Sequence, residues 1–585
     1  MNQALGPKYQ LSFAKHRSRY IQVQLSLPAS EEPRVLSLPN WIFGSYLIRD
    51  FARHLMDMCA QTAHGHPVAL RPIDQHSWTL AACSEPVTVR YQVYCADFSV
   101  RTAHVDADHV FFNGTSVFLQ VHGAESLPHQ VVMQADGPLN SRVATTMPAV
   151  DVDARGFGCY QAAGYAALID YPVEIADFIE RRFEIDGVPH RLAFTNALPN
   201  TDFDRIAADI EQICRTEIAL FGGAPFSQYL FLIALDESGF GGLEHADSTA
   251  LIFPAKHLPA LGQSGMTDEY QRFLSLCAHE YFHNWNVKRI KPAAFAGLVL
   301  DQPAHTRLLW LFEGFTSYFD DWLVRHAGLI DQSQYLKALQ QTINRAVQGP
   351  GWHRQTLEES SFYAWTRFYQ QDENAINAIV SYYTRGAVVA LLLDLYLRSK
   401  GKSLLEVIQR IWSEHADTPI QEGRAIEQLI ESVAEEPLGE FFDSALRSTE
   451  PLALVEQLAQ FGVHAQPIAQ ISGVDTGLLI QEQGDDGATV RVVIEDGPAA
   501  VAGIAAGDKI IAVDGFAVNA REWSARMARY RPGDQLEVHL FRQGRLRCYS
   551  LLLKEPRLNH LSLKADDSDP QAVARRNDWL AVCPL

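Results

Sequence analysis

Residues 279 to 283 read His-Glu-Tyr-Phe-His, a pattern that strongly limits the local fold. Four residues make about one turn of an α-helix, so His279 and His283 project from the same helical face. Two imidazoles on one face can bind a single metal ion, and Glu280 beside them can accept a proton from a metal-bound water. Residues 272–278 contain no glycine or proline and Pro292 follows, so the segment is predicted to be a helix that Pro292 closes.

Two histidines alone do not complete a catalytic zinc site, which normally has three protein ligands and an open position for water. The best third ligand is Glu313, which lies in the apolar run Leu-Trp-Leu-Phe-Glu-Gly-Phe at 309–315. A carboxylate in an apolar helix is costly unless it is paired or bound to a metal. A salt-bridged or partly exposed glutamate is the simpler alternative, and Asp301 and Asp321 are weaker candidates.

Asp320 is a candidate for a supporting role near such a site. It follows Glu313 by about two helical turns and therefore lies on roughly the same face. Its carboxylate could accept the second ring N–H of a metal-binding histidine and so fix the tautomer of that ring. An ordinary helix acid explains the residue equally well.

The composition excludes several classes of protein. The chain has 585 residues, 47% of them hydrophobic, and a formal net charge of −20. Nucleic acid is not an expected partner, because binding it usually requires a basic surface. No apolar run approaches the length of a membrane span, and the first residues lack the apolar core of a signal peptide. The eight cysteines form no C-x-x-C pair, which favours reduced thiols. We therefore expect a cytoplasmic protein with no membrane partner.

Hydrophobic periodicity divides the chain, which is too long for one core. Alternating runs such as 20–25 and 87–94 predict a β-sandwich-like domain over residues 1–165. The apolar run 229–235 fits a buried strand. A largely helical pattern then extends from 267 to 448.

Within the helical region, the sequence predicts helices over 305–327 and 376–400. Short strands with glycine turns follow over 475–555. The last residues, 557–585, are expected to form a tail or a packing strap. Together these patterns predict a multidomain α+β protein.

The metal-binding segments resemble a known family. His279-Glu280-x-x-His283 followed by Trp-Leu-Phe-Glu-Gly-Phe at 310–315 resembles the gluzincin metallopeptidases, the thermolysin-like group that includes zinc aminopeptidases. The stretches 283–292 and 38–51 are similar to the glycyl aminopeptidase family in particular. Two departures are a longer separation between His283 and Glu313, which an inserted loop at 287–304 would explain, and Phe-Gly at 43–44 where the family usually has Pro-Gly.

The resemblance implies a thermolysin-like α/β plus helical catalytic domain over 166–450. It implies one zinc ion bound by His279, His283 and Glu313, with Glu280 as the general base. The activity implied is removal of amino-terminal residues, with small ones such as glycine or alanine preferred. A zinc endopeptidase on the same scaffold and an adaptor with an inactive protease domain are the alternatives.

Two further segments gain roles from the resemblance. In zinc aminopeptidases a glycine-rich segment ending in a glutamate binds the free α-amine of the substrate. Glu244 matches that glutamate, and Gly241 and Gly242 would permit close approach of the peptide backbone. A surface acid is the alternative for Glu244. His245 is expected to be structural or to shape the pocket.

The segment Ser-Tyr-Tyr-Thr-Arg-Gly-Ala at 381–387 resembles the aminopeptidase Y-x-K-G segment, with Arg385 in place of lysine. Tyr383 would then donate its phenol to the oxyanion that forms during hydrolysis. Tyr382 is the competing choice, and core packing would explain either residue.

Residues 490–515 look like part of a bacterial-type PDZ domain, which we expect over 455–556. The upstream residues Gly477, Leu478, Leu479 and Ile480 match the loop whose backbone N–H groups receive a peptide C-terminal carboxylate. The expected partners are therefore peptide substrates with a free amino terminus and peptide C-termini at this groove. A groove that the protein itself fills, or that serves only for packing, is the alternative.

Overall fold

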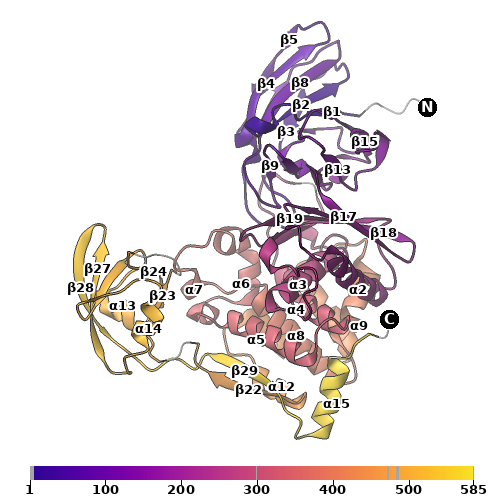
Figure 1. The fold of residues 1–585 in the computed structure, drawn as a ribbon. Coiled ribbons are helices and arrows are strands. Elements are labelled where there is room, and N and C mark those ends of the chain that lie inside the picture. Colours follow the sequence, from indigo (N-terminus) through magenta and orange to yellow (C-terminus); the bar gives the residue numbers. More distant parts are fainter. Residues whose placement is uncertain (1–5, 298, 471–472, 482–485, 584–585) are drawn as a thin grey trace. The chain divides into compact units, whose positions relative to one another are not determined.

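The computed structural model describes residues 6–297, 299–470, 473–481 and 486–583. Figure 1 shows its elements, which form two compact units. The first unit comprises residues 1–304 with 411–420 and 583–585, and the second comprises 305–410 with 421–582. The multidomain α+β class that the sequence predicts is confirmed, and the predicted catalytic region 166–450 is divided between the two units.

The first unit begins with strands, as the alternating runs predict. Strands β2 (Tyr20–Leu27) and β8 (Val87–Tyr94) pair antiparallel along their whole length, and alternate residues of each are buried. Strand β16, which follows the predicted boundary at 165, also pairs with N-terminal strands. The largest sheet has the order β14 (Ala149–Val152), β15 (Gly158–Ala162), β12 (His129–Met133), β1 (Lys8–Ser12), β2, β8, β4 (Leu55–Thr62), β5 (Pro67–Val68). The two smaller sheets have the orders β13 (Arg142–Ala144), β16 (Val173–Ala176), β10 (His109–Phe112), β9 (Ala103–Val105), and β11 (Gln120–Val121), β3 (Arg34–Ser37), β7 (Ser77–Leu80), β6 (Leu70–Pro72).

A five-stranded sheet follows in the same unit. Its order is β17 (Ile179–Ile185), β18 (Val188–Thr195), β19 (Tyr229–Asp236), β21 (Ser248–Pro254), β20 (Gly241–Glu244). Strands β18, β19 and β21 are parallel, and β19 is largely buried, as its continuous apolar run predicts. Strand β20 is antiparallel to β21 and lies at the edge, so one side of its backbone has no strand partner within this sheet.

Helices α2 (Phe203–Phe221) and α3 (Asp268–Phe282) accompany this sheet, and α3 contacts both β20 and β21. The Thr267 side chain caps α3 by accepting a hydrogen bond from the backbone N–H of Tyr270. The helix ends at Phe282, well before Pro292, so the predicted end was wrong. The buried Asn284 side chain donates to the carbonyl of Tyr281 at 2.7 Å and so satisfies an acceptor that a further turn would have used.

Helix α1 precedes the five-stranded sheet, and the other remaining helices described in this paragraph follow α3 along the chain. The predicted helix over 305–327 is α4, but the helix predicted over 376–400 is two helices, α7 and α8. Ile379 has extended backbone between them, and its carbonyl lies against Gly351, where a Cβ would come within 2.1 Å. The bounds are α1 (Tyr165–Ile169, before the five-stranded sheet), α4 (Leu309–His326), α5 (Gln332–Ala346), α6 (Leu357–Phe362), α7 (Ala375–Ala378), α8 (Thr384–Ser399), α9 (Leu404–His415), α10 (Ala425–Ala434), α11 (Gly439–Arg447) and α12 (Leu454–Gln460).

The second unit also contains the PDZ-like strands and the chain's last elements. The strands form one sheet around a core that includes Trp523 and Met527. The order is β23 (Leu478–Ile480), β24 (Ala488–Val493), β25 (Lys509–Val513), β27 (Gln535–Arg542), β28 (Arg545–Leu552), with β26 (Phe516–Ala517) on β25 and helices α13 (Pro498–Ala502) and α14 (Trp523–Met527).

The segment after the PDZ-like strands is folded. Strand β29 (His560–Ala565) pairs with β22 (Val463–Ile468), and α15 (Pro570–Trp579) ends in the fully buried Trp579. The Trp579 indole N–H donates to the Tyr318 hydroxyl at 3.0 Å. The segment is therefore a packing strap within the second unit. Among the described residues, no helix combines the length and the apolar composition that crossing a membrane requires.

Candidate active site

The two motif histidines lie at the C-terminal end of α3. His279 is half-buried and His283 is buried at the helix C-cap; their ring centroids are 4.7 Å apart. His283 Nδ1 lies 2.8 Å from the backbone oxygen of Asn286. A carbonyl can only accept, so Nδ1 carries the proton and Nε2 keeps the lone pair that binds a metal. Asn286 is a site residue that the sequence did not single out.

Glu280 lies directly against the edge strand β20. A Cβ built on Gly242 would come 2.2 Å from Glu280 Oε1, so any larger residue there would displace the carboxylate. Gly241 has φ of 153°, a conformation that L side chains rarely adopt. The close contact at Gly242 is therefore with the motif glutamate, and the predicted approach of a peptide backbone at Gly241 and Gly242 stays a prediction.

The carboxylate of Glu244 is buried at the end of β20. Its side chain is 4% exposed, and Oε1 has no hydrogen-bond partner among the described residues. Glu244, Glu280 and His283 offer donor atoms that all lie within 4.8 Å of one another. A buried carboxylate without a partner is costly, so this position favours a cationic ligand.

The N-terminal loop at 38–51 contributes to the Glu244 pocket. A Cβ on Gly44 would lie 2.3 Å from Glu244 Oε2, and φ at Gly44 is 85°. The loop is supported by aromatic contacts, with the Phe43 ring 4.8 Å from Trp41 and 6.1 Å from Phe295 between centroids. The family-like motif at 38–51 marked this loop, but its contact with Glu244 was not predicted from the sequence.

Asp170 fixes the turn that follows Glu244. One carboxylate oxygen contacts His245 Nδ1 at 3.1 Å and Lys288 Nζ at 2.8 Å, and the other accepts the N–H of Ala246 at 3.0 Å. Burial alone would raise the pKa of Asp170, but Lys288 and His245 outweigh burial and hold that pKa well below its usual range. Asp170 therefore connects the turn that contains His245 to Lys288 in the segment after α3.

The other predicted residues lie in the second unit. Glu313 lies on α4, is buried, and is surrounded in sequence by the apolar residues that suggested it. Burial, then the phenol of Tyr369, then the carboxylate of Glu313 raise the pKa of Tyr382 well above its usual value. Tyr383 is half-buried at the start of α8, with its hydroxyl 3.5 Å from that of Tyr369. Tyr369 is a third candidate phenol that the sequence did not single out.

The first unit thus brings together His279, Glu280, His283 and Glu244 with the two glycines. The roles of Glu313, Tyr383 and Asp320 with them stay predictions. Asp320 is half-buried on α4, and its Oδ1 accepts the N–H of Asp321 at 2.6 Å. For His283, the second ring N–H already has the backbone oxygen of Asn286 as its acceptor.

The loop that is predicted to receive a peptide carboxylate has internal hydrogen bonds. The N–H of Gly477 donates to the Asp475 side chain at 2.7 Å, and the N–H of Leu478 donates to the Thr476 hydroxyl at 3.2 Å. A peptide carboxylate would compete with both side chains for these amides.

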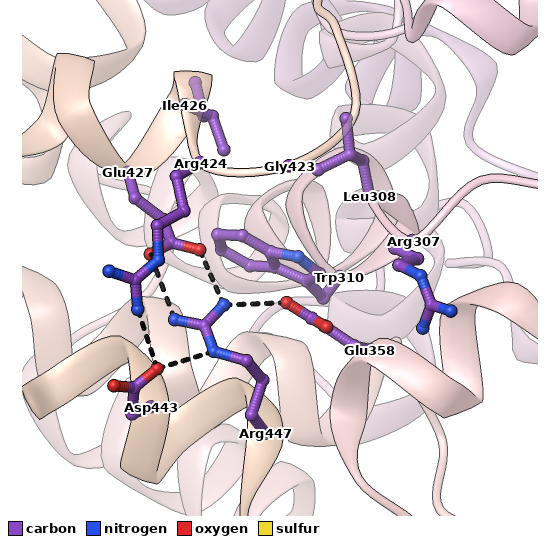
Figure 2. A pocket seen from close by; sticks show the side chains of 10 residues that line it. All are labelled: Arg307, Leu308, Trp310, Glu358, Gly423, Arg424, Ile426, Glu427, Asp443 and Arg447. Atoms are coloured by element: carbon purple, nitrogen blue, oxygen red, sulfur yellow. Dashed lines mark hydrogen bonds and ion pairs between the residues drawn. The ribbon is translucent and has the colours of Figure 1, made fainter. Parts of the chain in front are cut away.

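A large cavity of about 290 Å³ lies elsewhere in the second unit (Figure 2). It is lined by charged side chains that neutralise one another. Arg447 contacts Glu427 at 2.7 Å, Glu358 at 2.8 Å and Asp443 at 2.7 Å, and Arg424 contacts Asp443 at 2.9 Å. The charges of Arg424, Arg447, Glu358, Glu427 and Asp443 are thus paired with one another, and the predicted catalytic residues do not line this cavity.

Comparison with known proteins identifies the family of the chain. Residues 8–177 match the peptidase M61 N-terminal domain, 272–389 match the M61 glycyl aminopeptidase model, and 470–553 match a PDZ domain. The crystal structure of an aminopeptidase N family protein from Idiomarina loihiensis has 38% identity and a TM-score of 0.93, covering 98% of this chain and 100% of that one. The chain belongs to the M61 glycyl aminopeptidase family. It is therefore a metallopeptidase with a C-terminal PDZ domain.

More distant structures share less with this M61 peptidase. An M1 zinc metallopeptidase from Deinococcus radiodurans has 15% identity and a TM-score of 0.48, covering 77% of this chain and 96% of that one. Among curated proteins, no sequence matches the chain.

Proposed function

We propose that this M61 peptidase is a zinc aminopeptidase that releases small amino-terminal residues such as glycine or alanine. The observation that carries the proposal is the buried Glu244 carboxylate, with its unpartnered Oε1, beside Glu280 and His283. An α-ammonium group bound there would satisfy that oxygen. A free amino terminus is therefore the substrate feature that this site fits. An endopeptidase would have no use for such a carboxylate.

The donor atoms fit one zinc ion. His279 and His283 share a helical face, the tautomer of His283 is fixed by Asn286, and Glu313 would complete the three protein ligands. Zinc, when bound, acts as a Lewis acid toward the scissile carbonyl and activates water.

The chain's own residues then have defined tasks. Glu244 binds the substrate ammonium, and the free side of β20 receives the peptide backbone as an added strand. Glu280 accepts a proton from the attacking water at its carboxylate and passes that proton to the leaving nitrogen. A tyrosine hydroxyl, assigned to Tyr383, donates a hydrogen bond to the carbonyl oxygen as negative charge builds there.

The preference for small residues rests on the N-terminal loop. Because Gly44 lies directly against the Glu244 carboxylate, and the ring cluster of Trp41, Phe43 and Phe295 supports the loop, little room remains beside the bound amine. Hydrolysis of amino-acyl nitroanilides is the test. Glycyl and alanyl substrates should be cleaved fastest, a chelator should abolish cleavage, and added zinc should restore it. Faster cleavage of bulky residues would refute the size preference, and activity that survives complete zinc removal would refute the metal's role.

The two neighbouring tyrosines can be separated by substitution. With Tyr383 as the donor, Tyr383→Phe should lower kcat by about 10²–10³-fold with little change in KM. Tyr382→Phe should mainly change thermal stability, because its ring is fully buried. Steady-state kinetics and melting curves of both variants check this assignment, and the reverse pattern would transfer the role to Tyr382.

For the PDZ domain, we propose peptide C-termini as ligands of the groove beside β23. Binding at Gly477 and Leu478 would require Asp475 and Thr476 to release their hydrogen bonds to these amides. Leu479 and Ile480 would then contribute to the same loop.

A further inference from the structure

Arg101 lies at the opposite end of β20 from Glu244. It belongs to the loop between β8 and β9 in the N-terminal strands of the first unit. A Cβ built on Gly241, the first residue of β20, would be 3.5 Å from Nη2 and 3.7 Å from Nη1 of Arg101. Strand β20 thus has a carboxylate at one end and a guanidinium at the other. Because successive residues of a strand point to opposite faces, Arg101 lies beside the face of β20 opposite to the one that meets Glu280 at Gly242.

The Arg101 guanidinium has no ion-pair partner in the part of the chain that the structure describes. Its Nε is buried without a hydrogen-bond partner, and among the described residues the group makes no ion pair or hydrogen bond. A partly buried guanidinium without a partner is costly. Its five N–H donors in a planar fork match a carboxylate. The chain's net charge of −20 repels carboxylates in general, so binding one requires such a local cation.

The loop holds Arg101 in place. The fully buried Asn113 donates from Nδ2 to the carbonyl of Val100 at 2.8 Å and to that of Thr102 at 3.2 Å, and its backbone N–H donates to Thr102 at 3.0 Å. The N–H of Arg101 itself donates to the Ser99 hydroxyl at 3.2 Å. The backbone on both sides of Arg101 is therefore fixed before any ligand arrives, which lowers the entropy cost of binding.

The direction of a bound peptide follows from the proposed role of Glu244, on which this inference rests. With its amine at Glu244, a peptide on the free side of β20 runs towards Gly241, antiparallel to the strand. Strand β20 has 4 residues. Antiparallel strands advance about 3.4 Å per residue, so a paired peptide needs only a few residues to span β20. The C-terminal carboxylate of a dipeptide or tripeptide would then come within reach of Arg101.

We propose that Arg101 binds a carboxylate on the leaving side of the scissile bond, and that its source is the C-terminus of di- and tripeptides. The enzyme then cleaves short peptides, with Glu244 binding the amino terminus and Arg101 binding the carboxyl terminus of one substrate. An acidic side chain of the substrate near the scissile bond would present the same carboxylate group to Arg101.

The test compares kcat/KM for release of glycine by the zinc-loaded full-length enzyme. The substrates are Gly-Phe, Gly-Phe-amide and Gly-Phe-Asp-amide. The wild type should prefer the free acid over the amide by about 10- to 100-fold, as expected for a charge-assisted pair. Arg101→Gln should bring that ratio to about one. Arg71→Gln, an exposed arginine on β6, is the matched control and should keep the wild-type ratio.

Each outcome decides one point. A wild-type ratio near one, or an unchanged ratio in Arg101→Gln, would overturn the proposal. A preference for Gly-Phe-Asp-amide over Gly-Phe would overturn the terminal source and assign Arg101 to an acidic side chain. Cleavage of Gly-Phe-amide supports the aminopeptidase function independently of the role of Arg101. If none of the three substrates releases glycine, the result contradicts the aminopeptidase function itself. Melting temperatures of both variants verify that they fold.

Discussion

Glu280→Gln is expected to lower kcat by about 10²–10⁴-fold while zinc stays bound. Glutamine has nearly the same shape, so it keeps the packing of this buried side chain against Gly242, but it cannot accept a proton from water. The metal ligands assigned here do not include Glu280, so metal content should not change. The measurements are kcat on glycyl nitroanilide and zinc per chain by elemental analysis.

Glu269→Gln is the matched control for this prediction, since Glu269 lies exposed in the first turn of the same helix. It should retain wild-type kcat and zinc. Wild-type activity in Glu280→Gln would exclude the general-base role. Loss of zinc in that variant would instead assign Glu280 to the metal.

Glu244→Gln is the second large effect, with an expected fall in kcat/KM of about 10²–10³-fold for substrates with a free amine. The variant loses the charge that faces the substrate ammonium in a buried pocket, whereas an N-acetylated substrate has no ammonium to lose. Cleavage of the acetylated substrate should be poor in both proteins and should change little. Steady-state kinetics on the paired substrates measure the difference.

Glu237→Gln serves as the control for Glu244, because Glu237 is exposed on the loop that leads to β20. It should leave both rates unchanged. An equal proportional loss on free and acetylated substrates in Glu244→Gln would mean that Glu244 supports the strand and does not read the amine.

The sequence predicted the parts of the site that depend on local spacing. His279 and His283 are one helical turn apart, so their shared face followed from helix geometry alone. Glu313 was recognisable as a carboxylate in an apolar helix. The glycines of β20 indicated a close backbone approach, and the structure shows that Glu280 is the group approached at Gly242.

Contacts between distant segments could not be predicted in this way. The orientation of His283 depends on the backbone carbonyl of Asn286, which accepts from the His283 ring. Asn286 lies in the turn after α3, where the Asn284 side chain donates to the carbonyl of Tyr281. The pocket of Glu244 depends on Gly44, and the far end of β20 depends on Arg101. Both residues lie in N-terminal loops. The hydrophobic periodicity of the sequence does not indicate which strand those loops contact. The break between α7 and α8 has the same origin, since the carbonyl of Ile379 packs on Gly351.

The most direct test of the aminopeptidase assignment is digestion of one peptide, Gly-Ala-Phe-amide, and its N-acetylated form by the zinc-loaded wild type. Mass spectrometry of the products over time shows which bond is cut. The site described here predicts release of free glycine from the unblocked peptide and almost no cleavage of the acetylated one. Equal cleavage of both peptides, or a first cut at the Ala-Phe bond, would contradict the role of Glu244 and identify an endopeptidase.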